Sequence, residues 1–387
     1  MIEDMNTAAS TPSDLWIANT VSDLVQGDVR EHLPLARIPL QGDVLGLGTT
    51  TSIDNGELSF LRTPDGNTAI WKCQANDGGI RELKPGDGSG HFPYVCFSRD
   101  ASDLRRPVDL TLLGPSQGRP LQALVGEAIQ LLRNRGELPE APIYGLRLVA
   151  RWTSLIITVA SKLCMGQQRR NRSLTTAPGA AAEAERSVYD LLQHYRLAEE
   201  DHGDRTDPIR FLGTSLQWEC CGFWDNDPCQ GRVTVPVAGD HLHLHGCSSN
   251  LRFGGHLHHD HPESELLELE ALSLYPLQHI HQLASDLAIE ELRFDAGNTS
   301  FKVCNRGSMD VSDVGVAIVI DNSYNTHRYL RLPWLSAGET EFFSVPLPDL
   351  SPGMHQLEVI ADPEGHILES QELQGNNRMA IALMIEG

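Results

Sequence analysis

One stretch of the sequence carries most of its chemical information: His243-Leu-His245-Gly-Cys-Ser-Ser-Asn-Leu-Arg-Phe-Gly-Gly-His256. Side chains alternate between the two faces of a β-strand, so His243 and His245 are predicted to project from the same face. The two glycines predict a turn, after which His256 can return on the neighbouring strand of a hairpin. Three neutral imidazoles with open coordination positions are typical of a catalytic zinc site rather than of a closed structural one.

Two other interpretations of these histidines compete with a metal site. An isolated exposed histidine is usually a surface residue, and a histidine-rich tract can bind metals loosely. The spacing within a β-like segment favours ligation by His243, His245 and His256. The three histidines within residues 258–261 follow the turn without a fixed geometry, and we expect them at the surface. Zinc is the expected metal, although imidazole also suits iron, nickel and copper.

The composition indicates a folded, acidic chain with more than one domain. It has 387 residues, 40% of them hydrophobic. Thirty Lys+Arg against 52 Asp+Glu give a formal charge of -22, which disfavours binding to nucleic acid or to an anionic membrane. The longest apolar runs, such as Leu155–Ala160, are far shorter than the roughly 20 residues of a transmembrane helix. We therefore expect no nucleic-acid partner and no membrane.

The start of the chain and its cysteines bear on the compartment. Residues 1–6 lack the basic start and apolar core of a secretory signal. The eight cysteines are scattered without a repeated Cys-x-x-Cys pattern, which is typical of reduced thiols in a large chain. The sequence therefore predicts a cytoplasmic protein.

The periodicity of apolar residues divides the chain near residue 283. The segments predicted before this point are strands Glu57–Leu61, Ala69–Cys73, Ile143–Val149, Leu155–Ala160 and Arg232–Val237, and helices Gly118–Arg135 and Ala181–Leu197. The segments after it are short β-like runs separated by turn residues, of which Val314–Ile320 is typical. We predict a flexible N-terminus (1–14), an α/β (α+β) domain with mixed and antiparallel sheets (15–283) and an all-β, immunoglobulin-like sandwich (284–387).

Several blocks of the first domain resemble one enzyme family. The block ending in His256 resembles the zinc signature of the α-acetolactate decarboxylases, His-Leu-His followed by eight variable residues and Gly-Gly-His. Gly42–Thr49 is similar to the family's GDFGLGT and Ile53–Leu58 to its LDGEL, each with one residue inserted. Ile143–Arg147 resembles the family's FYAIR strand, and Cys221–Phe223 resembles its VGF.

This resemblance covers roughly residues 15–280 and implies a two-lobed fold and a zinc-dependent carboxy-lyase. Such an enzyme converts a small-molecule substrate, 2-acetolactate, to acetoin and CO₂ in acetoin biosynthesis. By position, His243, His245 and His256 would hold the metal, and Glu57 would be the carboxylate beside it. The metal would stabilise the enediolate left when CO₂ departs, and Glu57 would orient or transfer the proton. Without the motif, Glu57 would be interpreted as a solvated charge on a strand.

The sequence departs from the family at the arginine that would bind the substrate carboxylate. Direct counting from the FYAIR-like strand reaches Thr158. Arg172 or Arg186 could take the role if the intervening segment is an insertion, and Arg172 is favoured. The family's C-terminal acidic residue has no secure counterpart. The alternative is therefore a catalytically inactive or repurposed metal-binding scaffold.

The last hundred residues resemble a different module. Asp286–Glu290, Val303–Gly307, Val359–Pro363, Glu369 and Asn376-Asn377 are similar to a CARDB-type immunoglobulin-like domain. This resemblance implies a role in interaction or packing rather than in catalysis. The sequence leaves open a homodimer and a protein partner for this module.

Overall fold

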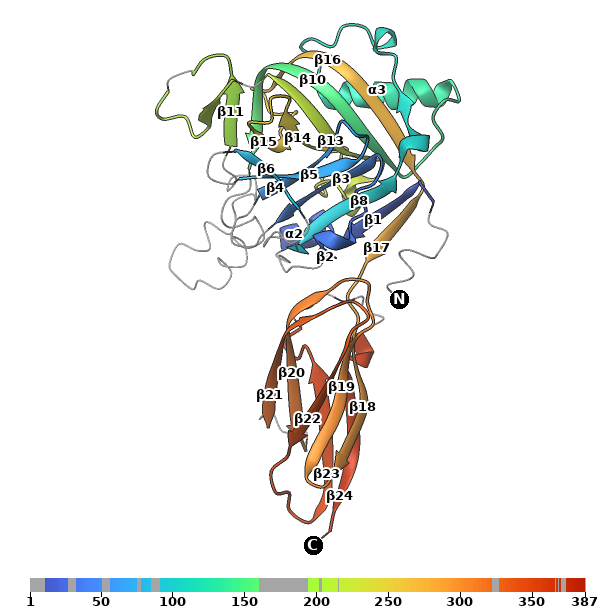
Figure 1. Cartoon of the computed structure of the whole chain (residues 1–387), viewed down its shortest axis with the longest axis vertical. Coiled ribbons are helices and arrows are strands. Elements are labelled where there is room, and N and C mark those ends of the chain that lie inside the picture. Colours follow the sequence, from blue (N-terminus) through green and yellow to red (C-terminus); the bar gives the residue numbers. More distant parts are fainter. Residues whose placement is uncertain are drawn as a thin grey trace. The chain divides into compact units, whose positions relative to one another are not determined.

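A computed structural model describes residues 11–26, 33–50, 56–74, 78–84, 91–159, 194–201, 204–214, 216–321, 327–365, 367, 369 and 374–386. They form two compact units, which divide between Gln282 and Leu283 (Figure 1). Arg172 and Arg186 lie outside the described residues. Neither described helix is long and apolar enough to cross a membrane.

The larger unit contains two main β-sheets. The first has seven strands in the order β17-β1-β8-β3-β4-β5-β6. These strands are β1 (Asp14–Ala18), β3 (Val44–Thr50), β4 (Gly56–Arg62), β5 (Thr68–Cys73), β6 (Ile80–Glu82), β8 (Tyr94–Asp100) and β17 (His279–Leu283). The short strands β2 (Leu33–Pro34) and β7 (His91–Phe92) pair with each other, and a short helix, α2 (Val21–Gln26), follows β1.

The second sheet has eight strands, and its long strand β10 organises it. The strands are β9 (Arg106–Pro107), β10 (Ile143–Thr158), β11 (His194–Ala198), β12 (Arg210–Gly213), β13 (Gln217–Asp225), β14 (Leu242–Ser248), β15 (Gly254–Leu257) and β16 (Glu265–Leu277). The first half of β10 pairs with β13 and with β16, while its last residues pair with β15. The path β10-β13-β14-β15 therefore closes on itself. β12 runs parallel to β11, so the sheet is mixed.

Helix α3 (Leu121–Asn134) packs against the second sheet. Its apolar residues recur every three or four positions, which places Leu124, Val125 and Ala128 on one buried stripe. They share a core with Trp152 and other residues of the sheet. This core fixes the outer face of the second sheet and leaves its other face to the first sheet.

The smaller unit is a sandwich of two antiparallel sheets. One has the order β18-β19-β22 and the other β21-β20-β23-β24. The strands are β18 (Leu287–Asp295), β19 (Asn298–Asn305), β20 (Val311–Ile320), β21 (Arg328–Leu335), β22 (Thr340–Pro346), β23 (Gly353–Ala361) and β24 (Arg378–Ile385). Alternating apolar side chains from both sheets, among them Phe301, Val316 and Leu357, form its core.

The predicted fold class is confirmed, with sheets dominating and few helices. Ile143–Val149 and Leu155–Ala160 were predicted as β, but they belong to one strand: β10 runs from Ile143 to Thr158, because the polar residues between them alternate with the buried Trp152 instead of ending the strand. Arg232–Val237 is not a strand, and it contains a proline that cannot donate a ladder hydrogen bond.

The other differences concern one helix and one strand. The predicted helix Ala181–Leu197 lies mostly outside the described residues, and its described end belongs to strand β11, paired with β10. Strand β21 was not predicted, because Arg328, Arg331 and Pro333 interrupt its apolar pattern.

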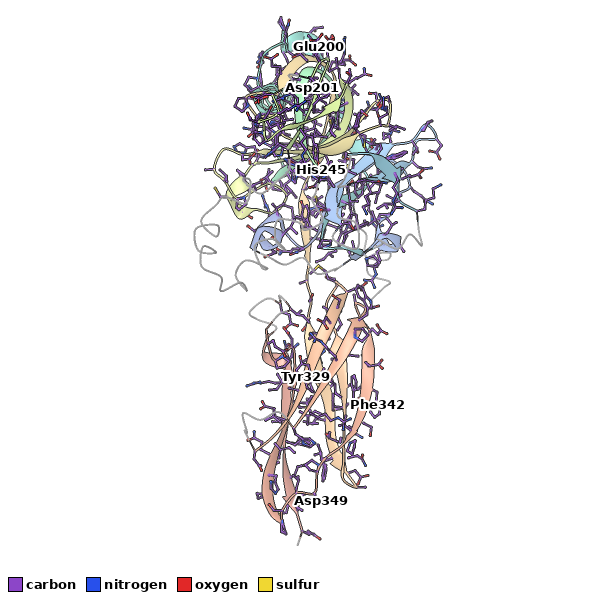
Figure 2. All side chains as sticks on the ribbon, turned by 90° about the vertical axis from the view of Figure 1, so that its left-hand side faces the viewer. Glu200, Asp201, His245, Tyr329, Phe342 and Asp349 are labelled. Carbon is purple, nitrogen blue, oxygen red and sulfur yellow. The ribbon has the colours of Figure 1, made fainter. Side chains whose placement is uncertain are left out.

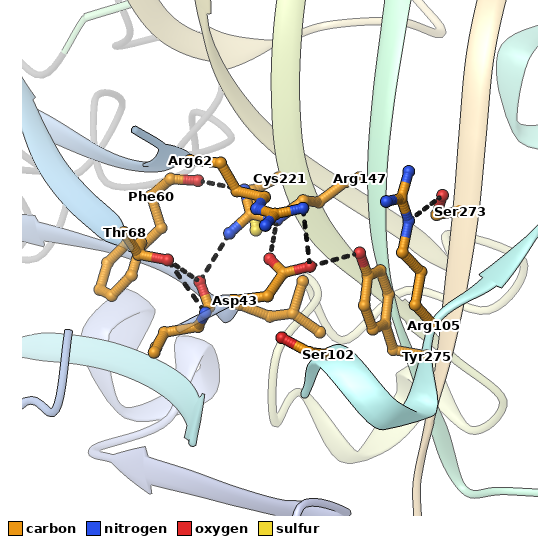
Figure 3. A network of polar contacts seen from close by, with 12 residues as sticks. Asp43, Phe60, Arg62, Thr68, Ser102, Arg105, Arg147, Cys221, Ser273 and Tyr275 are labelled. Carbon is orange, nitrogen blue, oxygen red and sulfur yellow. Dashed lines mark hydrogen bonds and ion pairs between the residues drawn. The ribbon is translucent and has the colours of Figure 1, made fainter. Parts of the chain in front are cut away.

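A buried ion pair joins the two sheets (Figure 3). Asp43, directly before β3, is fully buried, and its Oδ1 accepts a hydrogen bond of 2.6 Å from Nε of Arg147 on β10. The Nη groups of Arg147 donate to the carbonyl oxygens of Phe60 and Val44, both at 2.8 Å. The hydroxyl of Tyr275 donates to Oδ2 of Asp43 at 2.8 Å. One arginine thus holds two segments of the first sheet, the start of β3 and strand β4, against the second.

We predict that Asp43→Asn lowers the free energy of unfolding of the larger unit by about 3–5 kcal/mol, because it leaves the Arg147 charge buried without its partner. Urea unfolding followed by tryptophan fluorescence measures this loss. Asp313→Asn is the matched control, since Asp313 pairs with Arg331 at an exposed site, and it should cost no more than about 1 kcal/mol. Equal effects of the two substitutions would contradict a structural role for the buried pair.

Candidate metal centre

The strand register brings the three predicted histidines together. His245 on β14 is the direct cross-strand partner of His256 on β15, and His243 lies two residues before His245 on the same face. One ligand nitrogen from each of the three lies within 4.8 Å of the others. The Gly-Gly-His256 segment starts β15 itself, so the hairpin predicted from the sequence is present. Figure 2 places His245 among the packed side chains of the larger unit, and His245 is only 2% exposed.

Two backbone carbonyls set the orientation of the rings. Nδ1 of His243 donates to the carbonyl oxygen of Val233 at 2.5 Å, and Nδ1 of His245 donates to that of Leu58 at 2.9 Å. A carbonyl oxygen only accepts, so each Nδ1 carries the proton and each Nε2 of the neutral ring presents a lone pair. The irregular segment at Val233 and strand β4 of the first sheet therefore both orient the candidate ligands.

The donor set fits a divalent transition metal. Nε2 of His243 and Nε2 of His245 lie 3.1 Å apart. Two lone pairs facing each other at this distance repel unless a cation lies between them. Two nitrogens on a tetrahedral zinc ion, each about 2.0–2.1 Å from it, are roughly 3.3 Å apart. The spacing of these two atoms is thus close to what a shared zinc ion requires.

The histidines are held in the form that binds metal. Burial lowers the pKa of His243 to about 4. Burial, with the neighbouring imidazoles adding to it, keeps the pKa of His245 and that of His256 well below the usual histidine value. All three rings are therefore neutral at pH 7, the protonation state that a metal ligand needs.

Glu57 approaches the histidines from the first sheet. It lies on β4, and its Oε2 is 3.6 Å from Nε2 of His245. Its side chain is 17% exposed, and burial raises the pKa of its carboxyl group to about 8. A carboxyl group from the first sheet thus lies beside one of the three imidazoles that the second sheet brings together.

The glycines of the motif blocks allow close backbone approach around this centre. A Cβ atom on Gly56 would lie 1.8 Å from the carbonyl oxygen of Cys73, and one on Gly222 would lie 2.0 Å from that of His243. A Cβ on Gly255 would lie 2.6 Å from the carbonyl oxygen of Thr158. Any side chain at these positions would push apart the strands that carry Glu57, His243 and His256.

Two of the histidines that follow the turn are buried, although the sequence analysis predicted all three at the surface. His258 and His259 are 9% and 7% exposed. His258 Nε2 lies 2.5 Å from the hydroxyl oxygen of Thr158, and Nε2 of His259 donates to the carbonyl oxygen of Leu242 at 3.0 Å. The prediction failed because strand β10 continues to Thr158 and covers the segment after β15. His261 is half-buried.

The substrate-binding arginine is not identified among the described residues. Thr158, the position reached by direct counting, is the cross-strand partner of His256 and so lies beside the centre. Arg147 is engaged in the ion pair with Asp43 and in two carbonyl contacts. Its role, and that of Tyr275, escaped the sequence analysis because a buried ion pair between distant segments leaves no local pattern.

Comparisons with known proteins match both parts of the chain. α-Acetolactate decarboxylase from Bacillus subtilis strain 168 is 16% identical, with a TM-score of 0.43, over 70% of this chain and 88% of that one. A Staphylococcus aureus protein described as similar to α-acetolactate decarboxylase is 13% identical, with a TM-score of 0.43, over the same shares. At these identities the matches say nothing about activity. A search of curated proteins finds no match.

The smaller unit matches a family model. Residues 292–380 match CARDB. The solved CARDB domain of a Pyrococcus furiosus protein is 18% identical, with a TM-score of 0.23, over 26% of this chain and 88% of that one. Both resemblances stated from the sequence, to α-acetolactate decarboxylases and to CARDB, are therefore found.

We predict that the purified chain binds one zinc ion and that His256→Ala weakens binding at least about 100-fold, because it removes a ligand that the other two histidines cannot replace. Competition of a zinc chelator with the protein measures this affinity. His241→Gln is the matched control: His241 belongs to the same tract, but it stacks on Trp224 and its Nδ1 donates to the carbonyl oxygen of Asp225. Equal zinc loss in both variants would instead indicate a loose histidine tract.

Proposed function

We propose that the larger unit is a carboxy-lyase that converts 2-acetolactate to acetoin and CO₂ with a zinc ion held by His243, His245 and His256. The observation that carries the proposal is the Glu57 carboxyl group 3.6 Å from Nε2 of His245, which clusters with His243 and His256. The motifs around all four residues resemble those of the α-acetolactate decarboxylases, which supports this substrate.

The chain prepares the ligands before any metal arrives. The carbonyl oxygens of Val233 and Leu58 fix the tautomers of His243 and His245. Such carbonyl contacts hold ligand rings in place and raise their basicity. A bound zinc ion would supply Lewis-acid chemistry, stabilising negative charge that develops on the substrate oxygens as CO₂ leaves.

Glu57 is the group that holds and moves the proton in this proposal. Burial raises the pKa of its carboxyl group to about 8, so that it can carry a proton near neutral pH. A cation on the neighbouring histidines would lower that pKa again. A group whose pKa lies near the working pH is suited to accept a proton in one step and return it in another. Because Glu57 approaches from the first sheet only, it would protonate the product carbon from one side.

The remaining assignments stay predictions. Arg172, with Arg186 as the alternative, is proposed to bind the substrate carboxylate. A homodimer, a protein partner for the sandwich and a cytoplasmic location are likewise proposed on the sequence alone. The second candidate function is a catalytically inactive or repurposed metal-binding scaffold. Such a scaffold would bind zinc but would not release acetoin from 2-acetolactate.

We expect the zinc-loaded chain to release acetoin from racemic 2-acetolactate and His256→Ala to release none above the spontaneous rate. The variant loses the metal and with it the Lewis acid. A colorimetric acetoin assay with matched protein concentrations makes the comparison. A zinc-loaded, folded parent without turnover would contradict the lyase and leave the metal-binding scaffold.

Glu57→Gln tests the proton-carrying role separately. The amide keeps the size of the side chain but cannot transfer a proton, so we expect kcat to fall about 10²–10⁴-fold. Zinc content should stay at one ion per chain, because the three histidines remain. Glu127→Gln on the exposed face of α3 is the control and should retain parental activity. An unchanged kcat in Glu57→Gln would show that the proton comes from elsewhere.

A further inference from the structure

A cavity of the larger unit lies where the two sheets meet, next to the ion pair of Asp43 and Arg147. Its volume is about 160 Å³. Its wall includes Arg62 at the end of β4, Arg105 directly before β9, and Ser273 on β16. Neither Glu57 nor the three histidines of the metal centre line it. The cavity is therefore a separate feature of the larger unit.

The polar groups at this cavity are mainly hydrogen-bond donors, most of them on Arg62 and Arg105, two exposed residues. Nε of Arg105 donates to the hydroxyl oxygen of Ser273 at 3.1 Å. Within the described part of the chain, the two terminal nitrogens of Arg105 and the hydroxyl proton of Ser273 meet no acceptor. Nη1 of Arg62 is 3.9 Å from Oδ2 of Asp43, which is too long for a hydrogen bond.

The charge at the cavity is positive in a strongly acidic chain. Arg62, Arg105 and Arg147 line the wall, against a single lining carboxylate, the exposed Glu219. Asp43 behind the wall is already bound by Arg147 and Tyr275. Arg62 therefore shares Asp43 with two closer partners, and Arg105 has no carboxylate at ion-pair distance among the described residues.

The rest of the wall is apolar, with Leu61, Val149 and Ala271 among its residues. A volume of about 160 Å³ equals that of about five water molecules at roughly 30 Å³ each. This is room for a carboxylate with a body of a few carbon atoms. A hydrated inorganic anion would make no apolar contacts with this wall, whereas an aliphatic group would pack against it.

We propose that this cavity binds a small aliphatic carboxylate, whose oxygens accept from Arg105, Ser273 and Arg62. A guanidinium group matches the two oxygens of a carboxylate. Arg62 belongs to the first sheet and Ser273 to the second, so the bound anion bridges the two sheets beside the pair of Asp43 and Arg147. Binding therefore stabilises the larger unit against unfolding by mass action.

Isothermal titration calorimetry of the full chain with isobutyrate tests the proposal. The protein is first freed of zinc with a chelator, so that binding of the carboxylate to the metal centre does not contribute. We expect saturable binding of one isobutyrate per chain and a rise of the unfolding temperature. Isobutyramide, which has the same shape without the charge, should not bind, and inorganic phosphate should bind more weakly than isobutyrate.

Variants locate the site. Arg105→Gln should weaken isobutyrate binding about 10–100-fold, because it removes a charge-assisted hydrogen-bond donor. Ser273→Ala should weaken it several-fold, and Arg331→Gln in the sandwich should leave it unchanged. Circular dichroism establishes that each variant is folded. Absence of saturable binding, equal binding of isobutyramide, tighter binding of phosphate, or unchanged affinity in folded Arg105→Gln would each overturn the proposal.

Discussion

The buried pair of Asp43 and Arg147 is the contact on which the arrangement of the larger unit depends. Arg147 is in β10, the strand to which β13, β15 and β16 all attach, and it reaches into the first sheet at Asp43, Val44 and Phe60. A buried charge without its partner strongly destabilises the fold, so arrangements that separate Arg147 from Asp43 are disfavoured. The two sheets are thereby fixed face to face, and Glu57 on β4 is placed opposite His245 on β14.

The candidate metal centre follows from that placement together with the strand register. Arg147, Cys221, His245 and His256 are successive cross-strand partners across β10, β13, β14 and β15, so their side chains share the face turned towards the first sheet. The same register thus aligns the junction of the sheets with the candidate ligands. The first sheet then contributes the carbonyl of Leu58 and the carboxyl group of Glu57. Neither sheet alone contains the complete site.

The proximity of the three histidines could be predicted because their spacing is local. Alternation on one strand and a short hairpin suffice to bring His243, His245 and His256 together. Long-range contacts leave no such pattern, which is why the pairing of Asp43 with Arg147 and the burial of His258 by β10 were missed. Strand β10 itself was divided in two because its polar middle obscured a regular alternation. The sandwich was predicted from its short β-like runs, but β21 was missed because its charged residues and proline interrupt its apolar pattern.

Zinc-edge anomalous diffraction from crystals of the zinc-loaded chain tests the central claim, that a metal lies between the two sheets. We predict one strong anomalous-difference peak about 2.0–2.1 Å from a ring nitrogen of each of His243, His245 and His256, with the Glu57 carboxyl group facing it. A fully loaded crystal without a peak among these three rings, or with zinc bound instead at His258 and His261, would contradict it.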